Sequence, residues 1–156
     1  MHSATLQKII TTCGGFLLGV LWMDLLFDTQ LLRAAPESAV PTISAYYLQA
    51  TTVAYPMNRL IALVMLITLA TAVHQLVQGR IARRVSVATL LLAGAPIVLA
   101  IARVVPNAMR LGAQAGSFAE QVDIAQGILR DHVGCLALVA AFVVIQIAVR
   151  PPSPER

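Results

Sequence analysis

The sequence predicts an all-α integral membrane protein, built as a bundle of four transmembrane helices. Of its 156 residues, 58% are hydrophobic and 12% charged, with a mean hydropathy of +0.80, whereas soluble proteins carry about 25% charged residues. Four apolar runs reach the ~20 residues needed to cross about 30 Å of hydrocarbon. None alternates strictly between apolar and polar residues, as a membrane β-strand does. Each run must therefore satisfy its backbone hydrogen bonds as a helix. We expect one membrane domain over residues 1–156.

The first transmembrane helix is predicted over residues 9–27. An apolar run after Lys8 also resembles a secretory signal peptide. This run is too long for a typical signal core and contains Asp24, so we interpret it as a retained helix. Gly15 and Gly19 form a GxxxG motif, which lets a neighbouring helix approach closely. That neighbour lies either within the bundle, which we favour, or in a second copy of the chain.

The outer loop after this helix contains all three tyrosines. Pro41 is expected to begin a short interfacial helix over residues 42–52, which carries Tyr46 and Tyr47. Tyr55 follows shortly before the second span. The loop therefore places the tyrosines near the lipid headgroups, where aromatic residues are enriched.

Three further spans are predicted, over residues 58–77, 85–105 and 131–149. Pro96 lies in the middle of the third span and is expected to kink it. The fourth helix should begin before its span, near Phe118, because Ser117 and Glu120 match a capping box. It would then project one or two turns beyond the membrane.

The distribution of basic residues predicts the orientation of the bundle. With four spans, both termini and the loop between the second and third helices share one side of the membrane. That side carries Lys8, Arg80, Arg83, Arg84, Arg150 and Arg156, and the other carries Arg33, Arg59, Arg110 and Arg130. Acidic residues count little in the positive-inside rule. We therefore expect a multi-pass protein of a bacterial inner membrane with both termini in the cytoplasm.

Polar residues gather near the outer end of every predicted span. Asp24 should lie below the membrane surface, where a lipid-facing charge costs up to about 3 kcal/mol. It should therefore face the bundle and pair with Arg103, while Asp28 lies one turn further out on the same face. The other residues at this level are Tyr46, Tyr47, Arg59, Asn107, Arg110, Arg130, Asp131 and His132.

We interpret these residues as a candidate binding site for a small amphipathic molecule, such as a quinone, a polyketide or a lipid headgroup. The molecule would enter from the outer leaflet beneath Tyr46 and Tyr47. His132 is the candidate catalytic residue, since a neutral imidazole at a partly hydrated position could accept a proton from a phenol or quinol. The alternative is a structural network that fixes the register of the helices.

Other kinds of site find little support in the sequence. Cys13 and Cys135 lie in apolar runs without a CxxC spacing, which argues against a zinc or redox site, so no metal site is predicted. His74 lacks a second histidine at its depth, as a bis-histidine haem would need. No basic run is longer than Arg83 and Arg84, so we expect no nucleic-acid binding. No cofactor is indicated.

The layout of these residues resembles the anthrone oxygenase-like family of small four-helix bacterial membrane proteins. The likeness consists of a tyrosine-bearing short helix with Tyr46 or Tyr47, of Pro106 and Asn107 at the end of the third span, and of His132 at the start of the fourth. Most members of that family have no assigned activity. For its site, the resemblance would imply cofactor-independent oxygenation of a phenolic polycycle.

Two functions compete with a small-molecule site. The first is a non-catalytic accessory subunit or assembly factor of a larger membrane complex, for which the GxxxG motif and the projecting fourth helix would be contact surfaces. The second is a small transporter, which would need a homo-oligomer to build two halves. No nucleophile–base pair or phosphate-binding loop indicates an enzyme.

Overall fold

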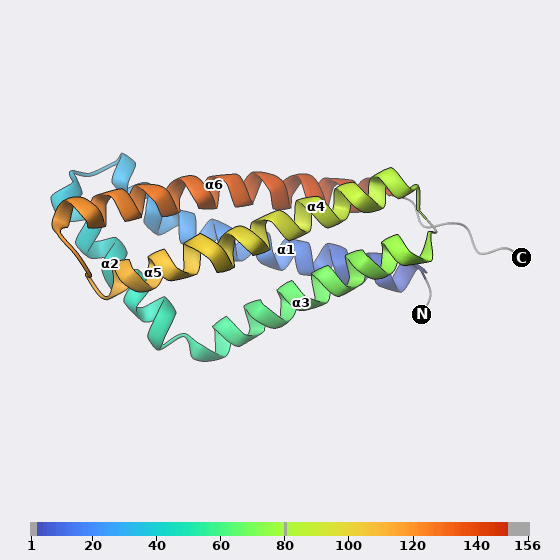
Figure 1. Cartoon of the computed structure of the whole chain (residues 1–156), viewed down its shortest axis with the longest axis horizontal. Helices are drawn as coiled ribbons and strands as arrows, with labels where there is room; N and C mark the ends of the chain where they lie inside the picture. Colours follow the sequence, from blue (N-terminus) through green and yellow to red (C-terminus); the bar gives the residue numbers. More distant parts are fainter. Residues whose placement is uncertain (1–2, 80, 150–156) are drawn as a thin grey trace, which may run out of the picture.

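The computed structural model describes residues 3–79 and 81–149 and confirms the all-α prediction, since these residues form helices and no strand (Figure 1). Four helical segments are long and apolar enough to cross a membrane, as predicted. They are Thr5–Leu32, Tyr55–Gln78, Arg83–Gly112 and Phe118–Ala148. The protein is therefore a multi-pass membrane protein. The segments are longer than the predicted spans because their ends include polar turns that a hydropathy pattern excludes.

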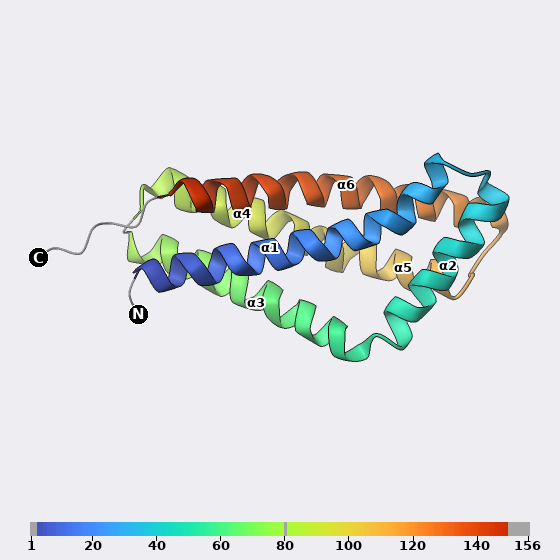
Figure 2. The ribbon, with the colours of Figure 1, turned by 180° about the vertical axis from the view of Figure 1, so that it is seen from behind.

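The first spanning segment consists of α1, Ser3–Asp28, and a 3₁₀ turn, η1, Thr29–Leu32. The loop helix α2, Pro36–Thr52, follows and crosses the end of the bundle (Figure 2). The prediction that this helix begins after Pro41 was wrong, since Pro41 lies inside it. Pro36 occupies the first turn, where a backbone N–H would have no helical partner and proline costs nothing.

Helix α3, Tyr55–Gln78, has all of its fully buried residues in its second half. Its buried residues are Thr68, Thr71, Ala72 and Gln75. Toward α2, its first half diverges from the other helices (Figures 1 and 2). The helix ends at Gln78 and is capped by Gly79, whose φ of 61° is a left-handed conformation that glycine adopts without steric cost.

The third spanning segment is not one regular helix. It consists of α4, Arg83–Leu99, a π-helical turn η2, Ala100–Val104, and α5, Val105–Gly112. Pro106 removes the N–H that would bond the carbonyl four residues earlier, which favours the wider turn. The departure from α-helix that we expected at Pro96 therefore lies one to two turns later.

The longest helix, α6, begins at Phe118 as predicted and ends at Ala148. The Ser117 hydroxyl accepts a hydrogen bond from the Glu120 N–H, and the Glu120 carboxylate accepts one from the Ser117 N–H at 2.7 Å. This capping box fixes where the helix starts. Its 31 residues correspond to about 46 Å at 1.5 Å per residue.

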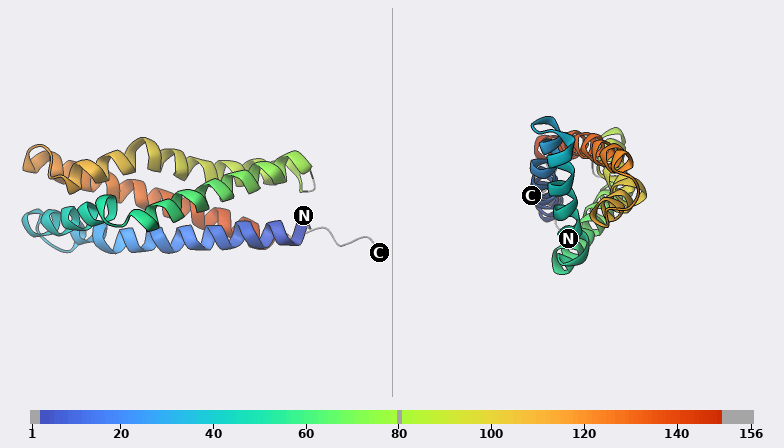
Figure 3. Two further views of the ribbon diagram at one scale, coloured as in Figure 1. Left: turned by 90° about the horizontal axis from the view of Figure 1, so that it is seen from below. Right: turned by 90° about the vertical axis from the view of Figure 1, so that its left-hand side faces the viewer.

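Two apolar clusters fill the bundle, one toward each end. The first joins α2 and α5 to the early part of α6 through Ile43, Leu111 and Ile128, and the second joins α1, α3 and α4 to Phe142 of α6. Seen end-on, the half of α3 next to α2 extends away from α6 (Figure 3, right). Polar side chains occupy α6 between the two clusters.

The GxxxG motif does not pack within the bundle, contrary to the interpretation we favoured. A Cβ atom added at Gly15 or Gly19 would meet nothing within 4 Å, whereas one at Gly14 would lie 2.7 Å from Phe142. Helix α1 therefore presents the neighbouring glycine to α6. The motif itself faces outward.

Candidate functional site

The centre of the polar region is His132, which α6 places against α1. Its ring is 4% exposed, with Nδ1 at 2.6 Å from Asp28 Oδ2 and Nε2 at 3.9 Å from Asp24 Oδ2. Asp24 and Asp28 are four residues apart, so both carboxylates lie on one face of α1. The prediction that the two aspartates share a face is confirmed. The expectation of a partly hydrated histidine was wrong.

Two tyrosines of α2 complete this group. The Tyr46 hydroxyl donates a hydrogen bond to Asp24 Oδ1, and the Tyr47 hydroxyl donates one to Asp28 Oδ1 at 2.7 Å. The Tyr46 ring also stacks on Phe27, with 4.0 Å between ring centroids. We call Asp24, Asp28, Tyr46, Tyr47 and His132 the aspartate–histidine cluster.

Both phenols of the cluster are hydrogen-bond donors over the physiological pH range. Burial and the neighbouring carboxylates raise the pKa of Tyr46 and of Tyr47 above the ordinary value for a phenol. The two hydroxyls therefore keep their protons and can each bind a carboxylate oxygen of α1. The result is a polar seam that attaches α2 to α1.

The expected pair of Asp24 and Arg103 does not form. Arg103 Nε instead lies 3.3 Å from Oδ2 of Asp131 on α6. The π-helical turn η2 contacts α6, whereas Asp24 is already bound by Tyr46 from α2. The side chain of Arg103 is 59% exposed and that of Asp131 11%, so the pair lies at the edge of the bundle.

The remaining predicted site residues do not join the cluster. Arg59 is exposed and stacks over Tyr55 of its own helix, at 4.1 Å from the ring centroid. Arg130 donates a hydrogen bond to the Gln126 carbonyl of α6 at 3.3 Å. Arg110 is exposed and Asn107 half-buried on α5. The arginines at this end therefore face outward rather than lining a site.

The two ring nitrogens of His132 face different carboxylates of α1. Asp28 is 1% exposed, and its two oxygens accept hydrogen bonds from Tyr47 and from the His132 ring. The second ring nitrogen faces Asp24. Because 3.9 Å is too long for a hydrogen bond, this nitrogen keeps the open position that a general base needs toward its substrate. Among the described residues, no group of three His, Cys, Asp or Glu side chains is arranged to hold a metal ion.

A second polar group, at the opposite end of the bundle, was not predicted from the sequence. The Gln75 amide donates to Gln7 Oε1 at 3.2 Å, the Gln7 amide donates to Gln146 Oε1 at 3.0 Å, and the Gln146 amide donates to Thr89 Oγ1 at 2.8 Å. We call these four residues the glutamine network. It joins all four spanning segments. The feature of the sequence that indicates this network is Gln146, the one strongly polar residue between positions 133 and 149.

Comparison with protein families identifies the chain. A family model for the SHR3 chaperone, described as ER membrane protein SH3, matches residues 2–147. The chain belongs to the SHR3 chaperone family. No curated protein and no solved structure matches it. The match covers nearly the whole chain, including all four spanning helices.

Membership of the SHR3 family overturns the resemblance to the anthrone oxygenase-like family. That resemblance rested on Tyr46 or Tyr47, on Pro106 with Asn107, and on His132. In the structure, the tyrosines and His132 contact the aspartates of α1. The family description, an ER membrane protein, also conflicts with the expected bacterial inner membrane.

Proposed function

We propose that this protein is a non-catalytic accessory or assembly factor that binds other membrane proteins in the ER membrane. The observation that carries the proposal is the match of residues 2–147 to the SHR3 chaperone family. The family description supplies both the ER membrane and the chaperone role. Two structural features support it.

The first supporting feature is that most polar atoms of the aspartate–histidine cluster bind one another. Its carboxylates and phenols bind one another and the His132 ring, at 2.6 Å for the pair with Asp28 and 2.7 Å for Tyr47 with Asp28. Polar groups that satisfy each other in this way stabilise a structure and leave few donors for a ligand. The cluster therefore suits a scaffold better than a catalytic site.

The second supporting feature is the first half of α3. All residues from 55 to 60 are exposed, and Leu63 and Leu66 are 52% and 64% exposed. Lipid is as apolar as these side chains, so helices associate in a membrane through packing and hydrogen bonds rather than by a hydrophobic driving force. A helix that few neighbours contact can therefore exchange lipid for the transmembrane helix of another protein. We assign contact with immature membrane proteins to this half of α3.

The orientation of the bundle belongs to the same proposal. Helix α1 begins, and α6 ends, at the same end as the α3–α4 loop (Figure 1). With Lys8, Arg83 and Arg84 at that end, we place both termini in the cytosol. Arg80, Arg150 and Arg156, which also entered the prediction, lie outside the described residues.

A folding assay tests the proposed function. Multi-span membrane proteins fused to a fluorescent protein are translated into ER-derived vesicles with and without this chain. The monodisperse fraction in mild detergent is then measured by size-exclusion chromatography. We expect the chain to raise that fraction several-fold for its target proteins, as a stability difference of about 1–2 kcal/mol changes abundance in cells.

Matched variants locate the effect. Leu63→Ala with Leu66→Ala should remove the gain, whereas Leu91→Ala with Val98→Ala should keep it. The two α4 residues are similarly exposed, at 65% and 66%. No gain for any of a broad panel of multi-span proteins would contradict the function, and an equal loss in both double variants would contradict the assignment to α3.

A further inference from the structure

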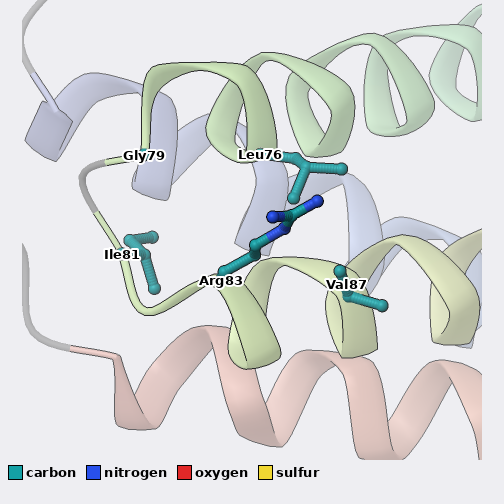
Figure 4. Close-up of a pocket in the computed structure, with 5 residues that line it drawn as sticks. All are labelled: Leu76, Gly79, Ile81, Arg83 and Val87. Atoms are coloured by element: carbon teal, nitrogen blue, oxygen red, sulfur yellow. The ribbon is translucent and has the colours of Figure 1, made fainter.

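A pocket of ≈ 360 Å³ lies at the end of the bundle opposite the aspartate–histidine cluster, between α3 and α4 (Figure 4). It is lined by Leu76, Gly79, Ile81, Arg83 and Val87. We call it the α3–α4 pocket. Its volume falls within the about 300–1,000 Å³ that small-molecule sites occupy.

The walls of the α3–α4 pocket are apolar apart from one cation. Arg83 extends from the start of α4 toward Leu76 of α3, and Ile81 and Val87 lie on either side of Arg83 (Figure 4). Gly79 contributes no side chain, and a Cβ atom there would meet nothing within 4 Å. The pocket therefore offers a guanidinium beside aliphatic surface, with an open side at the glycine.

Charge is distributed very unequally between the two ends of the bundle. Within residues 3–79 and 81–149, every carboxylate lies in the last turns of α1, in α2 or in the first half of α6. These residues are Asp24, Asp28, Glu37, Glu120, Asp123 and Asp131. Arg83 and Arg84 form no ion pair in the described part of the chain. Among the described residues, the pocket thus lies at the basic end of the bundle and its guanidinium has no acidic partner.

We propose that the α3–α4 pocket binds the phosphate headgroup of an anionic membrane lipid. Helix α3 ends at Gln78 and α4 begins at Arg83, so the pocket lies where spanning helices meet the headgroup layer. A guanidinium binds phosphate oxygens through two parallel N–H donors. Leu76 and Val87 contact the glycerol and the upper acyl carbons. Anionic lipids of the cytosolic leaflet also match the basic end of the bundle.

Lipid binding at this pocket rests on the proposed orientation of the bundle but not on the proposed contact of α3 with other proteins. The exposed half of α3 begins at Tyr55, and the pocket contacts the other end of that helix at Leu76 and Gly79. A lipid held there would bridge the ends of α3 and α4. The site would remain whether or not the first half of α3 contacts other proteins.

Native mass spectrometry of the full chain released from nanodiscs tests this inference. The nanodiscs contain phosphatidylcholine with increasing phosphatidic acid, and retained lipids are counted per protein. We expect one phosphatidic acid in preference to phosphatidylcholine. Arg83→Gln should weaken its retention about tenfold, as loss of a charge-assisted hydrogen-bond pair does. Arg59→Gln, an exposed arginine at the other end, should leave retention unchanged.

A second variant separates the pocket from simple charge attraction. Val87→Phe keeps Arg83 but fills the space beside it, so it should also weaken retention of phosphatidic acid. Equal retention by the wild type, Arg83→Gln and Val87→Phe would overturn the proposal. Complete displacement of the lipid by millimolar inorganic phosphate would also overturn it, because the site would then select free phosphate rather than a lipid.

Discussion

At the scale of single residues, His132 connects three helices. From α6, its ring lies 2.6 Å from Asp28 and 3.9 Å from Asp24 of α1. The same two carboxylates accept hydrogen bonds from the two phenols of α2. A buried carboxylate without partners is expensive, because the interior stabilises a charge far less than water does. The imidazole and the phenols therefore replace water around the aspartates, and the three helices are held at one relative position.

This role predicts that His132→Ala destabilises the protein strongly. Asp28, 1% exposed, would lose its partner at 2.6 Å, and removing one member of a buried pair costs about 3–5 kcal/mol. The melting temperature in mild detergent should fall, and Asp28→Asn added to His132→Ala should recover part of the loss. Arg130→Ala, an exposed neighbour on α6, is the control and should change little. An unchanged melting temperature for His132→Ala would show that the cluster does not hold the helices together.

The sequence predicted which residues of this region lie at one depth but not which of them touch. Asp24, Asp28 and His132 fall at the same level because each span has a fixed rise per residue. Contacts also depend on how each helix is rotated, and hydropathy does not determine that rotation. Arg103 was therefore assigned to Asp24, although it lies 3.3 Å from Asp131.

At the scale of elements, α2 depends on a close approach to α5. A Cβ atom added at Gly112 would lie 2.7 Å from the backbone nitrogen of Leu48 and 3.0 Å from its Cα. Backbone atoms of a packed helix cannot rotate away as a side chain can. The glycine therefore allows α2 to lie across the end of the bundle, where its tyrosines reach α1.

Gly112→Ala should consequently separate α2 from α5. We expect a loss of about 1–3 kcal/mol, typical of overpacking, with faster proteolysis in α2 than in the spanning helices. Gly19→Ala is the matched control because its Cβ would meet nothing within 4 Å, and it should be neutral or slightly stabilising. If both variants melt and are cleaved alike, α2 is not held by this contact.

The four spans could be predicted because length and hydropathy are properties of each segment alone. The π-helical turn η2, the early start of α2 at Pro36 and the glutamine network could not, because they depend on local proline effects and on packing between segments. Gln7 illustrates the difficulty. It precedes the predicted first span, yet it lies inside α1 and bonds Gln146.

At the scale of the whole molecule, the two ends of the bundle have different roles. The α2 end contains the aspartate–histidine cluster and the diverging half of α3. The other end contains the glutamine network, the α3–α4 pocket and basic residues without described acidic partners. Helix α3 is buried at the second end and more exposed at the first. A helix held in this way can contact another membrane protein while the rest of the bundle stays intact.

Site-specific photo-crosslinking in ER-derived vesicles tests the central claim, that this chain binds immature membrane proteins through α3. A photoreactive residue replaces Leu63, which is 52% exposed, or Phe142, which is buried and serves as the control. A multi-span protein that responds in the folding assay is translated to increasing lengths. We expect adducts from position 63 with incomplete chains, their loss once the last span is made, and none from position 142. Absence of adducts with incomplete chains, or adducts that persist equally with the finished protein, would contradict it.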